Sequence, residues 1–252
     1  MTTITRPVMR YHGGKFGVGG YIADWIIAHL PPHECYVEPF GGGGNVLLRK
    51  ARSHNEVYND LFGEVCALFR VLADRDSAAE LARLVSLTPY AEPVYAASFE
   101  RPAAESDLEL ARRLLARSWM SYGTDTPSSY RPSGFRGGTN TTARDPGLDW
   151  RGLPAALSAA ADRLQGVHVY ERPYEWVLGK YDGERTAFYV DPPYLHETRS
   201  AQYVGSYALE MDEAEHVALA ERLHALRGYV VLSGYDSALY RDLYAGWRRV
   251  ER

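Results

Sequence analysis

The sequence predicts an α/β fold built on a mainly parallel sheet. Short apolar stretches typical of buried strands alternate with longer segments of helical apolar spacing, an order that favours parallel strands. One strand runs into four consecutive glycines, and two others end in aspartates, Asp60 and Asp191. A chain of 252 residues has room for one such domain with a subdomain.

The elements follow one another along the chain. The expected strands cover 36–40, 57–60, 167–171, 187–191 and 229–233. The expected helices cover 21–30, 45–50, 61–72, 81–87, 94–99, 108–120, 154–165 and 211–226. Between 122 and 149 the composition shifts to Gly, Thr, Ser, Pro and Arg, which predicts a long functional or disordered loop. The sheet is therefore interrupted by a helical part between about 62 and 150.

The most informative segment is Asp191-Pro192-Pro193-Tyr194, at the end of the expected strand 187–191. The two prolines end the strand and stiffen the chain. A carboxylate, a rigid turn and an aromatic ring are thereby presented at the carboxyl end of a strand, where open α/β sheets bind ligands. These groups suit a planar ring held by its exocyclic amino nitrogen and by its face. Taken alone, an Asp-Pro pair is also a common turn.

A glycine-rich loop supports the functional interpretation. Gly41–Gly44 follow the strand 36–40, and Asp60 lies 19 residues after Gly41, the spacing at which nucleotide-type folds place an acid on ribose hydroxyls. The loop lacks Gly-x-Gly-x-x-Gly, since Val46 occupies the sixth position, and no Gly-Lys-Ser/Thr follows. This excludes dinucleotide and triphosphate sites. S-adenosylmethionine fits, with its ribose on Asp60 and its positively charged end near Glu38.

With these residues the chain resembles the Dam-type DNA adenine-N6 methyltransferases. Tyr11-His12-Gly13-Gly14-Lys15 resembles the N-terminal cofactor motif of that family. Residues 38–43 resemble its Asp/Glu-x-Phe-x-Gly-x-Gly signature with an extra glycine, and residues 230–236 resemble its late strand and loop. The resemblance spans roughly residues 9–248, with the motifs in the order of the family.

The resemblance implies a Rossmann-like class I methyltransferase sheet formed by residues 1–61 and 151–252, with a mainly helical DNA-recognition subdomain inserted at 62–150. It implies S-adenosylmethionine as cofactor, double-stranded DNA as partner, and the catalytic residues Asp191, Pro192 and Tyr194. The cofactor residues that it implies are Tyr11, Lys15, Glu38, Phe40, Gly41, Gly43, Asp60 and Asp191. Family members usually continue after the position of Trp247 with a strand hairpin, whereas this sequence ends at Arg252, so either the sheet is naturally short or part of its edge is missing.

The expected chemistry follows from the poor nucleophilicity of adenine N6, whose lone pair is delocalised into the ring. Asp191 can accept one N6 hydrogen and the Pro192 carbonyl the other, which frees the lone pair, while Tyr194 stacks on the base. The target adenine must be flipped out of the duplex. Methylation at cytosine C5 needs a cysteine in a Pro-Cys context, which neither Cys35 nor Cys66 has.

Contacts with DNA require basic groups on one face, because the net charge is −4. The candidates are Arg117 on the helix 108–120 and Arg131 and Arg136 in the loop after it; for the helical arginines a solvated face bonded to nearby glutamates is as plausible. Glu171 could contact the cofactor or cap a helix. Tyr203 and Tyr207 could close over the flipped base.

Other classes of function are disfavoured or left open. No His-Glu-x-x-His or Cys-x-x-Cys motif is present, so we expect no metal site. The apolar stretches are short and the N-terminus lacks a signal core, which predicts a cytoplasmic protein without a membrane partner. The two cysteines are expected to be buried free thiols.

Alternative functions remain open. They are cytosine-N4 methylation and RNA adenine methylation, whose enzymes usually have Ser or Asn in place of Asp191, and a catalytically inactive DNA-binding relative. We expect a monomer; the sequence leaves open whether a separately encoded restriction endonuclease accompanies it.

Overall fold

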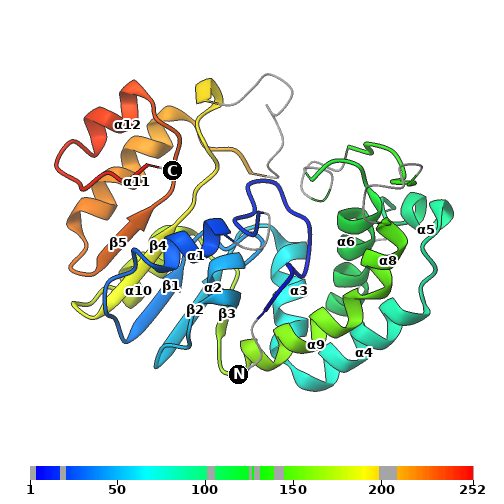
Figure 1. Cartoon of the computed structure of the whole chain (residues 1–252). Coiled ribbons are helices and arrows are strands. Elements are labelled where there is room, and N and C mark those ends of the chain that lie inside the picture. Colours follow the sequence, from blue (N-terminus) through cyan, green and yellow to red (C-terminus); the bar gives the residue numbers. More distant parts are fainter. Residues whose placement is uncertain are drawn as a thin grey trace.

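A five-stranded, entirely parallel sheet forms the centre of the computed structural model, which describes residues 4–17, 21–100, 106–124, 127, 131–138, 145–198 and 209–251 (Figure 1). The strands are β1 (Cys35–Glu38), β2 (Asn55–Asn59), β3 (His168–Tyr170), β4 (Thr186–Val190) and β5 (Tyr229–Leu232). Their order in the sheet is β3-β2-β1-β4-β5. The predicted Rossmann-like sheet is confirmed, and each predicted strand is present within two residues of its expected ends.

Most helices were also predicted, with ends shifted by a few residues. The described helices are α1 (Tyr21–Ile27), α2 (Asn45–Arg49), α3 (Gly63–Ala73), α4 (Arg75–Leu87), α5 (Glu92–Ala97), α6 (Asp107–Met120), α8 (Pro146–Arg151), α9 (Leu153–Leu164), α10 (Tyr174–Tyr181), the 3-10 turn η1 (His196–Thr198), α11 (Glu213–Ala225) and α12 (Ala238–Leu243). Helices α8, α10 and α12 were not predicted. Each is at most eight residues long, and the sequence analysis assigned no helical apolar repeat to these segments. Local capping starts α8, where Asp145 accepts a hydrogen bond from the Gly147 N–H.

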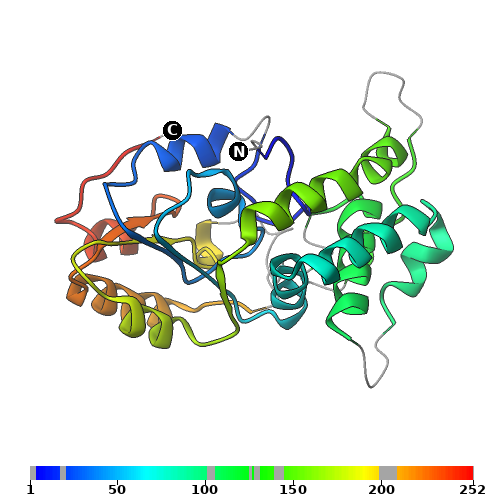
Figure 2. The same cartoon turned by 90° about the horizontal axis from the view of Figure 1, so that it is seen from below.

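The sheet is covered on both faces because the side chains of its strands alternate. Tyr36, Tyr58 and Tyr189 belong to a core cluster that includes residues of α1, α2 and α3. Val57 and Phe188 belong to a second cluster with residues of α10 and α11. Figure 2 shows the resulting three layers, with α1 on one side of the strands and α10 and α11 on the other. Burial on both faces explains why β4, the fully buried strand, is largely apolar.

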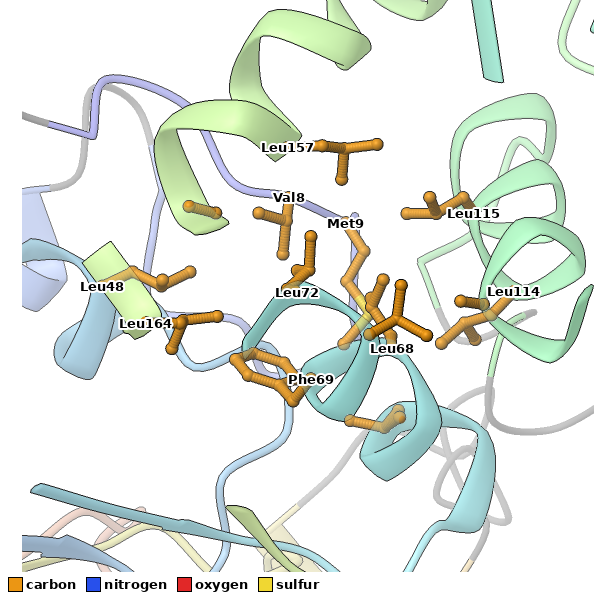
Figure 3. Packing of buried hydrophobic residues seen from close by; sticks show 14 of the residues in the cluster. Val8, Met9, Leu48, Leu68, Phe69, Leu72, Leu114, Leu115, Leu157 and Leu164 are labelled. Atoms are coloured by element: carbon orange, nitrogen blue, oxygen red, sulfur yellow. The ribbon is translucent and has the colours of Figure 1, made fainter. Parts of the chain in front are cut away.

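The helical part lies beside the β3 edge of the sheet and shares its core. Helix α3 packs against α6 and α9, and α9 packs against α4 (Figure 1). Figure 3 shows the buried side chains at this junction, which come from the N-terminal segment and from α2, α3, α6 and α9: Val8, Met9, Leu48, Leu68, Phe69, Leu72, Leu114, Leu115, Leu157 and Leu164. Helix α9, which follows the boundary expected at residue 150, thus also packs against these helices; the division into domains stays a prediction.

The N-terminal segment fastens the helical part to the sheet. The Arg10 N–H donates to Ser118 Oγ at 2.6 Å, and the Trp119 indole N–H donates to the Val8 carbonyl at 3.0 Å. The Arg10 guanidinium donates to the carbonyls of Ser121 and Tyr122 at the end of α6, at 2.7 and 3.0 Å. The residues that follow Arg10 are thus held by α6 as they enter the site described below.

No helix in the described ranges is long and apolar enough to cross a membrane.

Glu56, at the start of β2, is the centre of a buried ionic cluster. Its carboxylate accepts hydrogen bonds from Lys50 Nζ at 2.8 Å and from two nitrogens of the Arg163 guanidinium at 2.6 and 2.8 Å. Burial favours the neutral acid, but the hydrogen bonds from Arg163 and Lys50 hold the pKa of Glu56 below its ordinary value. The cluster joins the end of α2, the sheet and α9.

Replacement of Glu56 by alanine should lower the free energy of unfolding by about 3–5 kcal/mol, because two buried cations lose their partner. Urea denaturation measures this difference. The exposed Glu80, which pairs with Arg83 on the same helix, provides the control, and Glu80→Ala should leave the urea midpoint nearly unchanged. Equal midpoints for the Glu56→Ala variant and the wild type would show that the cluster does not stabilise the fold.

Candidate active site

A cavity of about 260 Å³ lies at the carboxyl ends of β1, β2 and β4. The carboxyl ends of these strands lie at the same height in the sheet, because Val37 of β1 is in register with Val57 of β2 and Phe188 of β4. The order of strands reverses between β1 and β4, which is where open α/β sheets bind their ligands. The cavity lining contains the eight residues expected for the cofactor: Tyr11, Lys15, Glu38, Phe40, Gly41, Gly43, Asp60 and Asp191.

The glycine loop has its shape because two aromatic rings lie beneath it. Tyr58 and Phe69 are stacked with ring centres 3.8 Å apart, and the Tyr58 hydroxyl donates to the Gly42 carbonyl at 2.7 Å. A Cβ at Gly41 would lie 2.2 Å from the Tyr58 ring, and one at Gly44 would lie 2.5 Å from the Phe69 ring. Gly44 also has a φ of +59°. Steric exclusion therefore requires glycine at both positions.

Asp60 holds the same loop from the next strand. One carboxylate oxygen accepts the Gly42 N–H at 2.7 Å, and the other accepts the Phe62 N–H at 2.8 Å. Burial raises the pKa of Asp60, and these backbone hydrogen bonds oppose the shift. The structure thus gives Asp60 a structural role in addition to the predicted contact with a ribose, which stays a prediction.

Asp191 follows the fully buried strand β4 and is held from two sides. One oxygen forms an ion pair with Lys15 Nζ, and the other accepts the Tyr194 hydroxyl at 2.8 Å. Lys15 Nζ also donates to the Gly13 carbonyl at 2.7 Å and lies 5.2 Å from the centre of the Tyr194 ring. The N-terminal motif and the Asp-Pro-Pro-Tyr motif, far apart in the sequence, therefore form one cluster of charged and aromatic groups.

Tyr235 adds an aromatic ring that the sequence analysis did not single out. Its ring centre is 4.9 Å from that of Tyr194 at an interplanar angle of 75°, and 57% of the residue is exposed. The ring lies in the loop after β5, within the segment 230–236 that suggested the family. Its place in that loop was the only signal in the sequence. The chain contains 19 tyrosines, so the residue type alone does not mark it.

Glu38 is a buried acid that lines the cavity. One of its oxygens accepts both the Tyr36 hydroxyl and the Leu47 N–H, each at 2.7 Å. Burial raises the pKa of Glu38 to about 7, despite these two hydrogen bonds.

The prediction that Arg117 contacts DNA is wrong. The side chain is 1% exposed, forms an ion pair with Glu64 of α3 and donates to the Ser98 carbonyl. The glutamate comes from a helix distant in the sequence, so the residues around Arg117 gave no sign of it. Arg112 and Arg113 are bonded to Glu109 on the same helix, which is the alternative that the spacing allowed.

The other DNA-binding candidates are nearer the surface. Arg131 is exposed, and the Arg136 guanidinium lies 3.9 Å from the Asp149 carboxylate. The Arg136 N–H donates to the Met120 carbonyl at 2.7 Å, which ties this segment to the end of α6.

The remaining residues that the sequence analysis named have different outcomes. Glu171 is absent from the residues that line the cavity, and its carboxylate instead pairs with Arg70 at 2.9 Å. Tyr203 and Tyr207 lie outside the described residues. Both cysteines are free thiols, as expected; Cys66 is buried, but Cys35 is only half-buried, which differs from the expectation. Within the described part of the chain, no group of three or more His, Cys, Asp or Glu side chains could hold a metal ion.

A parallel sheet of this order, with a glycine-lined cavity at its switch point and an Asp-Pro-Pro-Tyr turn beside it, defines a Rossmann-like enzyme that carries out chemistry on an amino-bearing ring. Comparison with protein families matches residues 11–252 to the D12 class N6 adenine-specific DNA methyltransferases. The chain belongs to this family.

Individual relatives agree with the family match. The DNA adenine methylases of Escherichia coli strain K12 and of Salmonella typhi are each 26% identical to this chain over 245 residues. The aligned part covers 95% of this chain and 84% of each relative. The predicted family and the predicted class of enzyme, an adenine-specific DNA methyltransferase, are confirmed.

The stability of the protein should depend on pH through Glu38. Its pKa is about 7 in the folded state and near its ordinary value of 4.5 when unfolded, so the folded state binds the additional proton between these values. The free energy of unfolding should therefore fall as the pH rises through this window, by roughly 3 kcal/mol in total. Urea denaturation at pH 5 and pH 8 measures the change.

Glu38→Gln keeps an oxygen that can accept from Tyr36 and Leu47 but cannot ionise. In this variant the free energy of unfolding should lack the pH dependence that Glu38 causes. The variant should therefore become more stable relative to the wild type as the pH rises. If the difference in stability between the two proteins stays constant from pH 5 to pH 8, Glu38 is not the source of the pH dependence.

Proposed function

We propose that the cavity binds S-adenosylmethionine and that Asp191, Pro192 and Tyr194 direct its methyl group to N6 of an adenine flipped out of duplex DNA. The observation that carries the proposal is the position of Asp191. Its carboxylate lies on the cavity lining, oriented by Lys15 and Tyr194, at the carboxyl end of β4.

The residues around the cavity fit the chemistry of this cofactor. Asp60 offers acceptors for the ribose hydroxyls, and the apolar side chains of Phe40, Leu61 and Phe62 provide a surface for the adenine ring. The buried carboxylate of Glu38 complements a cation. When bound, S-adenosylmethionine supplies an electrophilic methyl group.

The target base is activated by hydrogen bonding. Asp191 accepts one N6 hydrogen and the Pro192 carbonyl the other, which draws N6 out of the plane of the ring and frees its lone pair. These bonds strengthen as the nitrogen becomes tetrahedral, so they stabilise the transition state more than the bound base. Lys15 keeps Asp191 in place throughout, as a positioning residue.

The flipped base is held by aromatic rings. Tyr194 offers its face for stacking, and Tyr235 lies beside it on the exposed side. The Tyr194 hydroxyl also donates to Asp191. Tyr194 therefore has two roles, to bind the base and to orient the carboxylate.

The helical part is the proposed DNA-recognition region, with Arg131 and Arg136 as its contacts. Arginine binds phosphates and can bind guanine through two hydrogen bonds. The N-terminal segment connects this region with Lys15, because Arg10 donates to the carbonyls at the end of α6.

Asp191→Ala should reduce methyl transfer to DNA by at least a hundredfold, because the acceptor that acts on N6 is lost. Tyr194→Ala should lose stacking worth about 1–3 kcal/mol. Tyr194→Phe should have a smaller effect, since it loses only the hydrogen bond to Asp191. Incorporation of tritiated methyl groups into duplex DNA, followed by nucleoside analysis, measures all three.

Calorimetry with S-adenosylmethionine and thermal unfolding show whether the variants remain folded and bind the cofactor. Asp162, an exposed aspartate on α9, provides the matched control, and Asp162→Ala should be fully active. Substantial activity in Asp191→Ala or a methylcytosine product would overturn the proposal. A wild type that binds the cofactor and DNA without methyl transfer would identify an inactive relative.

Arg131→Ala and Arg136→Ala should each weaken DNA binding while cofactor affinity is unchanged. A lost phosphate contact should also reduce the slope of log K against log salt concentration by about one. Fluorescence anisotropy with labelled duplex at several salt concentrations measures both quantities. The exposed Arg83 of α4 provides a control that should bind DNA normally. If both variants match this control, recognition lies elsewhere on the molecule.

A further inference from the structure

Asn45, the first residue of α2, is a buried polar side chain to which the mechanism above gives no task. It lines the cavity and is 6% exposed. Its side-chain oxygen Oδ1 is shielded from solvent and accepts no hydrogen bond from the residues that the structure describes. Buried polar groups in native proteins are almost always satisfied, so this one calls for a partner that the chain alone does not supply.

The surroundings of Asn45 show where that partner would lie. The side-chain nitrogen Nδ2 is 3.1 Å from the position that a Cβ would occupy at Gly14, and equally close to that position at Gly43. The side-chain amide of Asn45 therefore lies between the N-terminal motif and the glycine loop. A larger residue at Gly14 or Gly43 would crowd it.

The place of Asn45 along the cavity follows from its neighbours. Gly13 accepts a hydrogen bond from Lys15, which pairs with Asp191, so Gly14 is next to the reacting end. Asp60 is bonded to Gly42, on the part of the glycine loop nearer to β2. A methyl donor with its ribose at Asp60 and its methyl group at Asp191 has one part still to be placed, its amino-acid chain. That part carries an ammonium group, a strong hydrogen-bond donor.

We propose that Asn45 binds the amino-acid end of S-adenosylmethionine, with Oδ1 accepting a hydrogen bond from the α-ammonium group. The inference rests on the proposed cofactor and adds a residue that positions it. Glu38 lines the same cavity and, when it is ionised, provides a negative charge for the same cation. A hydrogen bond to a charged group corresponds to about a tenfold or greater change in affinity.

Two ligands that differ only in the amino-acid chain test the proposal by calorimetry. S-adenosylhomocysteine carries the chain, whereas in 5′-methylthioadenosine a methyl group replaces it. Asn45→Leu and Asn45→Ala should bind S-adenosylhomocysteine about tenfold or more weakly than the wild type. Both should bind 5′-methylthioadenosine within about twofold of the wild type.

Thermal unfolding of the ligand-free variants gives a second readout. Leucine is similar in size to asparagine and removes the unsatisfied oxygen, so Asn45→Leu should melt at the wild-type temperature or above it. A structural asparagine would instead lower the melting temperature in Asn45→Leu. The matched control is Asn59, buried and bonded to the carbonyls of Pro39 and Arg172. Asn59→Ala should lose stability without discriminating between the two ligands.

The proposal is overturned if the Asn45 variants lose affinity equally for both ligands, or for neither. A wild type that binds neither S-adenosylmethionine nor S-adenosylhomocysteine would refute the proposed cofactor instead.

Discussion

The ion pair between Lys15 and Asp191 is the contact on which the arrangement of the site depends. It joins residues separated by 176 positions, one from the N-terminal motif and one from the end of β4. The pair is largely shielded, with 11% and 17% of the two side chains exposed, so loss of either partner would leave a poorly solvated charge. Tyr194 contacts both members, which fixes the aromatic ring and the carboxylate relative to each other. Two members of this cluster, Lys15 and Asp191, line the cavity.

The helical part and the sheet are joined too closely to be independent bodies. A continuous apolar core runs from the sheet through α3 to α6 and α9. The segment that contains Val8 and Arg10 lies against α6 and then continues into Lys15. The N-terminal segment therefore links α6 with the residue that pairs with Asp191.

The cavity concentrates features that cost stability. Gly44 is held at a positive φ above Phe69, Glu38 is a buried acid with a raised pKa, and Asn45 has an unsatisfied oxygen. Glu56, an equally buried acid outside the cavity, is by contrast surrounded by Lys50 and Arg163.

The sequence alone determined the class of fold, the strands, the family and eight of the residues that line the cavity. These are encoded locally: apolar runs make strands, prolines end β4, and glycines mark the loop that no side chain could enter. The short helices α8, α10 and α12 escaped prediction; side chains cap the first turn of α8 and of α12, which an apolar pattern does not reveal, whereas no side chain caps α10. Helix α9 was expected to belong to the catalytic domain, and its buried face packs against α3 and α4.

Only the tertiary structure decided which charged and polar side chains have partners. Arg117 was expected to contact DNA, but Glu64 of another helix holds it in the core. Glu171 pairs with Arg70 and does not reach the cavity, while Tyr235 comes to lie against Tyr194. Nothing near these residues in the sequence distinguishes them from other arginines, glutamates or tyrosines. Burial and pairing are set by segments that are distant along the chain and meet only after the sheet and the helices have packed.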